Sequence, residues 1–167
     1  MQPPTGRLKL NVDEAFKITA DVAGGGGILR DHKGICMLAF AKNYQGVISA
    51  LDVEARTLRD GFMICCSKGF LDIIVETDSL NLVHVVTGHT PRPWELTCII
   101  QKVAEITQKL KAQIKHVHRE ANQAAHSLAG HGCTTEHFSF LDSGAGLPHV
   151  VKGPYRLDKV GYPTFRP

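Results

Sequence analysis

The stretch Leu8-Lys-Leu-Asn-Val-Asp13, near the start of a 167-residue chain, decides how the fold begins. Apolar and polar side chains alternate along it, as expected for a strand whose successive side chains point to opposite faces. The apolar face carries Leu8, Leu10 and Val12, and the polar face carries Lys9, Asn11 and Asp13. The alternation therefore predicts a half-buried strand that ends at Asp13 and presents its carboxylate on the polar face.

Outward from this strand, the hydrophobic period switches between that of strands and that of helices. Five strands are expected, at residues 8–13, 24–30, 35–41, 71–75 and 112–117. Four helices are expected, at residues 51–65 with Gly69 as the C-terminal cap, 78–88, 94–110, and 120–129 with Gly130 as the stop. This order predicts the α/β class, with a five-stranded mixed sheet flanked by helices on both faces.

The chain length fits one domain with additions at its ends. We expect residues 1–6 to form an N-terminal extension, residues 7–133 to form the domain and residues 134–167 to form a C-terminal tail. In the tail, glycines, prolines and isolated aromatics replace the periodic pattern. Three residues are expected to dock the tail onto the domain, namely Phe138, Phe140 and Leu141.

The composition is ordinary for a soluble globular protein, with 43% hydrophobic and 21% charged residues. A net charge of +3 permits a nucleic-acid partner without requiring one. The five cysteines lack paired metal-binding spacing and are expected to be small buried hydrophobes in a reducing compartment. No apolar run reaches the ~18 residues of a membrane span, and the first residues lack a signal-peptide pattern. We expect an intracellular monomer, nuclear or cytoplasmic.

The four consecutive glycines from Gly24 to Gly27 allow two interpretations. A glycine-rich loop can cradle phosphate, but no Gly-Lys-Ser/Thr sequence and no helical pattern follow this run. A flexible strand start or close backbone packing is therefore the favoured interpretation.

Three acidic residues are placed so that strand ends and a helix can direct them at one point. Asp13 closes the first strand, and Asp78 follows the fourth strand at the next helix start. Glu54 is three residues after Leu51, which places it at the margin of the apolar stripe of its helix. Converging carboxylates repel one another unless a hard cation neutralises them, and their oxygens favour Mg²⁺ or Mn²⁺. The three acids therefore predict a metal site.

Five fragments resemble the ribonuclease H type 1 family, in order and with suitable spacing. They are Lys9-Leu-Asn-Val-Asp13, the Gly24–Ile28 run with Arg30-Asp31 and Gly34, Val53-Glu54-Ala55, Val75-Glu-Thr-Asp78-Ser79, and Arg119-Glu-Ala-Asn122-Gln-Ala-Ala-His126-Ser-Leu-Ala129. The sequence is most similar to the plant reverse-transcriptase-like branch, which resembles domains derived from retroelements. The resemblance covers roughly residues 7–130.

The resemblance implies a ribonuclease H-like fold and hydrolysis of the RNA strand of RNA–DNA hybrids with two divalent ions, Mg²⁺ or Mn²⁺. It implies that Asp13 bridges both ions and that Glu54 and Asp78 complete the shell of one. The expected partner is a nucleic acid, either an RNA–DNA hybrid or double-stranded RNA. The substrate-binding positions expected on this basis are Ser79, His118, Arg119 and Asn122.

Two positions depart from the family pattern. The fourth acidic position falls on His126, which shares a helix face with Asn122. A neutral imidazole can hold a water or ligate weakly but brings no negative charge, and the alternative is a surface histidine on a decayed site. Glu14 stands where many relatives have glycine, and its carboxylate would meet phosphates with the wrong sign. A second hypothesis is therefore a catalytically weakened module that still binds RNA or hybrid.

Other features carry alternatives as well. A zinc site could use His126, His131, Cys133 and His137, although their spacing matches no usual finger. Trp94 is interpreted as a core anchor at a helix start rather than a base-stacking platform. His118 could assist product or proton release, or be an ordinary loop histidine. A modest phosphate track or a solvated face could be formed by Lys109, Lys111, Lys115 and Arg119. A third hypothesis is a protein-interaction remnant of a retroelement, with the tail as its docking segment.

Overall fold

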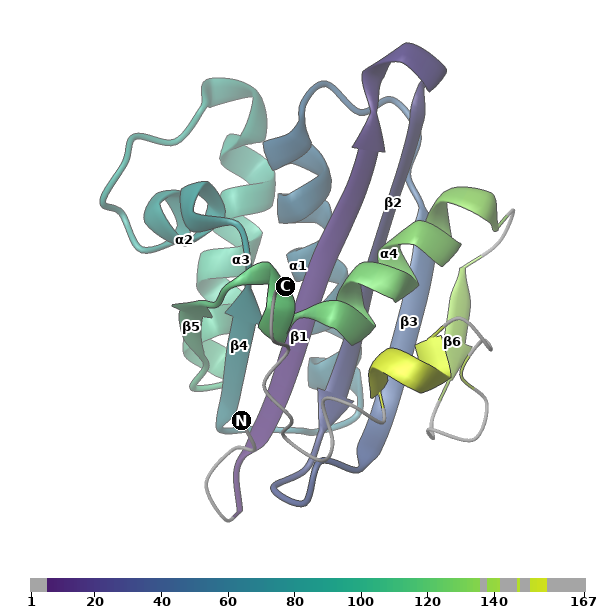
Figure 1. Ribbon diagram of the computed structural model, residues 1–167. Helices are drawn as coiled ribbons and strands as arrows, with labels where there is room; N and C mark the ends of the chain where they lie inside the picture. The colour runs from purple at the N-terminus through teal and green to yellow at the C-terminus, as the bar shows by residue number, and fades with distance from the viewer. Residues whose placement is uncertain (1–5, 136–137, 142–146, 148–150, 156–167) are drawn as a thin grey trace.

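The computed structural model describes residues 6–135, 138–141, 147 and 151–155. Its centre is one six-stranded sheet in the order β5-β4-β1-β2-β3-β6 (Figure 1). The strands are β1 (Leu8–Lys17), β2 (Val22–Arg30), β3 (Cys36–Asn43), β4 (Ile73–Thr77), β5 (Gln113–His116) and β6 (Ser139–Leu141). Parallel pairs β1–β4 and β4–β5 and antiparallel pairs β1–β2, β2–β3 and β3–β6 make the sheet mixed, as expected.

Helices cover both faces of this sheet, which confirms the expected layers (Figure 1). The α-helices are α1 (Ala50–Ser67), α2 (Leu80–Val86), α3 (Thr97–Lys109) and α4 (Gln123–Thr134). Short 3-10 turns are η1 (Ile18–Ala20), η2 (Trp94–Leu96) and η3 (Arg119–Ala121). Helices α1 and α3 lie behind the sheet in Figure 1, and α4 crosses in front of β1, β2 and β3. No helix among the described residues is long and apolar enough to cross a membrane.

Strand β1 differs from the expected half-buried strand in two ways. It continues past Asp13 to Lys17, because its antiparallel pairing with β2 extends to Lys17 and Val22. Its polar face is also buried, with Lys9 at 5%, Asn11 at 1% and Asp13 at 7% exposure. The physical reason is that α4 packs over this face, so both sides of the strand are covered.

The glycine run is the contact surface between β2 and its neighbours. A Cβ on Gly24 would lie 2.5 Å from the Cys133 nitrogen, and one on Gly26 would lie 2.5 Å from the Leu128 Cβ, both in α4. These separations are far below ordinary van der Waals contact. The run therefore lets a helix approach the sheet backbone closely, which is the close packing expected from the sequence.

Helix α4 passes through Gly130 and Gly132 and ends only at Thr134, so the expected stop at Gly130 is wrong. A Cβ on Gly132 would lie 2.7 Å from the Lys42 carbonyl oxygen of β3. Glycine usually weakens a helix interior, but here its small size permits packing against the sheet. Tertiary packing outweighs the local preference.

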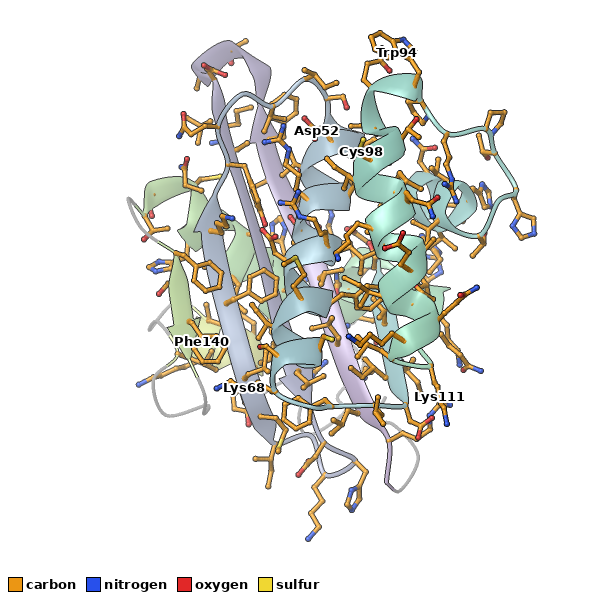
Figure 2. The ribbon with its side chains drawn as sticks, turned by 180° about the vertical axis from the view of Figure 1, so that it is seen from behind. Asp52, Lys68, Trp94, Cys98, Lys111 and Phe140 are labelled. Carbon is orange, nitrogen blue, oxygen red and sulfur yellow. The ribbon has the colours of Figure 1, made fainter. Side chains whose placement is uncertain are left out.

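The expected count of five strands is corrected to six, because residues 139–141, placed in the expected tail, pair with β3. The Phe138 ring stacks on Phe40 with 6.2 Å between centroids. The Lys68 ammonium lies 5.2 Å from the centre of the Phe140 ring, and these two residues are neighbours in Figure 2. Contacts far apart in sequence, rather than a periodic pattern, place this short strand.

Residues beyond β6 also pack on the side of the sheet that carries α4. Val151 and Leu147 are buried, in a cluster with Ile28, Cys36, Ala39, Ala41, Ala124 and Leu128. The Tyr155 hydroxyl accepts a hydrogen bond of 2.9 Å from the Cys36 backbone nitrogen. Residues 1–5 of the expected N-terminal extension lie outside the described residues.

Candidate functional site

The acidic site lies where the parallel strands β1 and β4 run side by side. Val12 pairs with Thr77 in the register of these strands, so the next residues, Asp13 and Asp78, are neighbours. Helix α1 contributes Glu54 from its first turns. The Ser49 side chain accepts a hydrogen bond from the Asp52 nitrogen and so caps the start of this helix. The structure thus brings the three sequence-predicted acids into one region.

A small pocket at this point is lined by Val12, Asp13, Glu14, Glu54, Thr57, Thr77 and Leu82. Thr57 and Thr77 were not singled out from the sequence, because single buried threonines have no distinguishing pattern. Both are almost fully buried, at 1% and 2% exposure. The Thr57 hydroxyl donates to the Val53 carbonyl over 2.7 Å, and the Thr77 hydroxyl accepts from the Ser79 nitrogen over 3.1 Å.

Ser79 holds Glu54 in place. Its hydroxyl donates to the Glu54 Oε2 atom over 2.6 Å and accepts from the Leu82 nitrogen over 3.1 Å. The second bond caps α2, so the start of that helix and the orientation of Glu54 depend on the same hydroxyl. Ser79 was expected to touch substrate, and its hydroxyl is engaged with Glu54 and with the first turn of α2.

Asp13, Glu14 and Glu54 have raised pKa values. Burial raises the pKa of Asp13 to about 6, and the neighbouring Asp78 carboxyl adds to the effect. Burial raises the pKa of Glu14 to about 7, with further contributions from the charges of Glu54, Asp13 and Asp78. The pKa of Glu54 is raised by burial, and its hydrogen bond from Ser79 opposes that shift. Negative charge at this point is therefore costly for the protein.

Glu14 is part of the cluster. Its Oε2 atom is buried and has no hydrogen-bond partner among the described residues. A buried carboxylate oxygen without a partner carries a desolvation cost that a cation would relieve. The sequence identified Glu14 as a departure from the family pattern, but only the fold shows that it faces the other acids.

His126 meets Asp13 directly. Its Nδ1 atom lies 3.0 Å from the Asp13 Oδ2 atom, and its side chain is 46% exposed. An ionised carboxylate only accepts hydrogen bonds, so this contact requires a proton on Nδ1 and leaves Nε2 of a neutral ring as an acceptor. His126, which replaces the fourth acid of the family pattern, therefore contacts Asp13, the first acid of that pattern.

Two other expected substrate positions are exposed. Arg119 is exposed, and its Nε atom lies 3.4 Å from the Asp78 Oδ2 atom. His118 is exposed as well, and its ring packs edge-on against His116 with 5.8 Å between centroids. Both side chains are accessible to a ligand.

Asn122 is placed differently, because it is fully buried. Its amide nitrogen donates to the Val12 carbonyl over 2.9 Å, and its amide oxygen accepts from Asn11 over 2.9 Å. Asn122 lies at the start of α4, one helical turn before His126, and its side chain is directed at β1. These contacts engage both ends of the amide within the protein.

Trp94 and the alternative zinc ligands were the other candidate features of the sequence. Trp94 is the first residue of η2, just before α3, and is 81% exposed, so its interpretation as a core anchor is wrong (Figure 2). The proline-flanked turn that starts η2 directs the ring outward while Leu96 takes the buried position. Of the alternative zinc ligands, His137 lies outside the described residues.

The donor chemistry of the acidic site fits a hard divalent cation. Carboxylate oxygens from Asp13, Glu54 and Asp78 are the ligands that Mg²⁺ and Mn²⁺ prefer, and the unpartnered oxygen of Glu14 adds a further donor. Among the described residues, no three His, Cys, Asp or Glu side chains are already arranged around one point as a metal site. Glu54 and Asp78 are partly buried, and each has a partner in the site, Ser79 for Glu54 and Arg119 for Asp78.

Comparison with known proteins places this site in a family. The profile of the family described as reverse transcriptase-like matches residues 11–132. A curated Arabidopsis thaliana protein named as a ribonuclease H protein is 29% identical over 132 residues, which are 78% of this chain. The matched region spans 21% of that relative's length.

Solved structures of RNase H proteins share the fold. RNase H1 from Halobacterium salinarum has a TM-score of 0.69 and 22% identity, with coverage of 76% of this chain and 97% of its own. The N-terminal RNase H domain of a Mycobacterium tuberculosis protein has a TM-score of 0.69 and 18% identity, covering 76% of this chain and 93% of its own. LC11-RNase H1, solved in complex with an RNA/DNA hybrid, has a TM-score of 0.67 and 18% identity, covering 75% and 96%.

The family match includes every residue of the acidic site, from Asp13 to His126. The structural likeness independently supports the mixed sheet and its helical layers. The chain therefore belongs to the reverse transcriptase-like family and has the ribonuclease H fold.

Proposed function

We propose that this protein is a metal-dependent endonuclease that hydrolyses the RNA strand of RNA–DNA hybrids. The observation that carries the proposal is the convergence of Asp13, Glu14 and Glu54 on one pocket, with the pKa of each carboxyl raised. Such a cluster is costly unless a ligand compensates it, and it lies within the family match. The solved hybrid complex of a structural neighbour supports the choice of substrate class.

Asp13, Glu54 and Asp78 would hold Mg²⁺ or Mn²⁺, two ions in the family pattern. The bound cations would supply Lewis-acid activation of water and charge stabilisation at the leaving oxygen. Ser79 keeps Glu54 oriented through its 2.6 Å hydrogen bond. The exposed guanidinium of Arg119, at the edge of the site beside Asp78, attracts the phosphate backbone of the substrate.

His126 has a specific role in this proposal. The Asp13 carboxylate accepts a hydrogen bond from His126 Nδ1–H and thereby fixes the orientation of the imidazole. A neutral ring then presents Nε2 as an acceptor for a proton or for a hydrogen bond from water. Unlike a carboxylate, a neutral imidazole at this position brings no negative charge that would repel the phosphates of the substrate. It also brings no charge to hold a second cation, so we expect weaker binding of that ion than a carboxylate would provide.

Cleavage of a labelled RNA–DNA hybrid, with Mg²⁺ and separately with Mn²⁺, tests the proposal. The wild type should cleave the RNA strand, and Asp13→Asn should not. Asp21→Asn is the matched control, because Asp21 is exposed and its positive φ of 47° is compatible with asparagine. Equal cleavage by wild type and Asp13→Asn would contradict the mechanism.

The second candidate is a hybrid- or RNA-binding module without turnover. Two observations favour it: His126 already occupies one oxygen of Asp13, and Glu14 adds a further acidic group to the cluster. This candidate predicts no cleavage by the folded wild type but binding that weakens steeply with salt. Turnover restored by His126→Asp would identify the lost carboxylate as the cause.

A further inference from the structure

A chain of buried amide hydrogen bonds connects β2, β1 and α4 beneath the acidic site. Arg30 Nη2 of β2 donates to the Asn11 Oδ1 atom over 2.7 Å, and Asn11 Nδ2 donates to the Asn122 Oδ1 atom over 2.9 Å. Asn122 Nδ2 then donates to the Val12 carbonyl over 2.9 Å. The side chains are almost inaccessible, with Arg30 at 2%, Asn11 at 1% and Asn122 at 0% exposure.

The chemistry of these groups gives the chain a direction. A guanidinium has only donors, so the amide oxygen of Asn11 must face Arg30. The amide nitrogen of Asn11 then faces Asn122, and it also donates to Glu76 Oε1 over 3.1 Å. Asn122 can receive this donor only through its oxygen, which leaves its nitrogen for the Val12 carbonyl. The Arg30 guanidinium, the Glu76 carboxylate and the Val12 carbonyl thus all require the same orientation of the two amides.

The end of this chain lies next to both members of the Asp13–His126 contact. Val12, which accepts the last hydrogen bond, immediately precedes Asp13. Asn122 lies one helical turn before His126, whose backbone nitrogen donates to the Asn122 carbonyl over 3.0 Å. The same residue therefore holds β1 through its side chain and the first turn of α4 through its backbone.

We propose that Asn11 and Asn122 are positioning residues that set α4 against β1 so that the His126 imidazole meets the Asp13 carboxylate. Both are too deeply buried to touch substrate, so their effect on the reaction passes through His126 and Asp13. The effect on cleavage rests on the proposed function, whereas the effect on the position of His126 does not. A displacement of about 1 Å at such a site can lower a rate by roughly two orders of magnitude.

The structure offers a matched control at the other end of α4. Asn43 of β3 donates its amide nitrogen to the Cys133 carbonyl over 3.2 Å, so it also ties a strand to this helix. Asn122→Asp and Asn43→Asp make the same isosteric change, and each places a carboxylate where an amide nitrogen met a backbone carbonyl. Only the first change is adjacent to Asp13.

The experiment compares these two variants by NMR of the histidine side chains and by steady-state cleavage of the hybrid. In the wild type, the ring nitrogens of His126 should show a proton held on Nδ1. In Asn122→Asp this signature should be lost, and kcat should fall by at least about tenfold with KM changed less than about threefold. Asn43→Asp should keep the wild-type signature and kcat within about twofold.

Several results would overturn the inference. An unchanged His126 signature in folded Asn122→Asp would do so, as would an equal loss in Asn43→Asp, which would indicate general destabilisation. Asn122→Ser, which retains a donor, serves if Asn122→Asp does not fold, with the same NMR criterion. If the wild type cleaves no hybrid, the proposed function fails, and the NMR comparison alone decides whether Asn122 positions His126.

Discussion

Replacing Glu14 by glutamine should stabilise this protein at alkaline pH and not at acidic pH. The Glu14 carboxyl is buried among other acids, and its pKa is raised from 4.5 to about 7. For an acid whose pKa is raised on folding, the protonated form is favoured in the folded state. Its contribution to stability is therefore present below the unfolded pKa and is lost as the pH rises through the folded pKa.

The size of the effect follows from that shift. One pKa unit corresponds to about 1.4 kcal/mol, so ionising Glu14 in the folded protein costs at most about 3.5 kcal/mol, and solvent screening at this partly buried group lowers that figure. Part of this cost is shared with Asp13, Glu54 and Asp78, whose charges contribute to the shift. We therefore expect Glu14→Gln to raise the free energy of unfolding by about 1–3 kcal/mol at pH 8 and by less than about 1 kcal/mol at pH 5.

Urea unfolding at these two pH values, in buffer free of divalent cations and followed by circular dichroism, measures the difference. Glu105→Gln is the matched control, because Glu105 is exposed on α3 and the change in charge is identical. It should alter stability by less than about 0.5 kcal/mol at either pH. A variant Glu14→Gln that is equally stabilised at both pH values, or destabilised at pH 8, would refute the electrostatic reasoning.

Three further predictions concern the cation, the helix contact and the substrate. Mg²⁺ should raise the melting temperature of the wild type more than that of Asp13→Asn at matched ionic strength, because bound ligand stabilises the folded state, and equal shifts in differential scanning fluorimetry would argue against a site at Asp13. Gly26→Ala should destabilise by about 1–3 kcal/mol in urea unfolding, since its Cβ would lie 2.5 Å from the Leu128 Cβ. Gly130→Ala, which meets nothing within 4 Å, is its control and should not lose stability. Arg119→Ala should weaken hybrid binding and reduce the slope of log K against log salt by about one, as measured by fluorescence anisotropy, and an unchanged slope would remove Arg119 from the phosphate contacts.

The acidic site shows where prediction from sequence succeeds and where it stops. The placement of Asp78 after a buried strand and of Glu54 at a helix margin follows from local periodicity, whereas the parallel pairing of β1 with β4 that sets Asp13 beside Asp78 came only from the structure. The contact of His126 with Asp13 joins residues 113 positions apart, and the sequence indicated only the helix face on which His126 lies. Glu14 likewise faces the other acids because of the way α1 packs against β1.

The sequence by itself determined the order of strands and helices, the mixed sheet covered on both faces, and the acids available for a metal. These properties are encoded in contiguous residues, whose alternation or helical spacing marks the face that must be buried. Only the tertiary structure decided that β1 is buried on both faces, that β6 completes the sheet, that Asn122 lies inside and that Trp94 lies outside. Each of these depends on contacts between segments distant along the chain, and such packing overrides the local preference of a glycine, an amide or an aromatic ring.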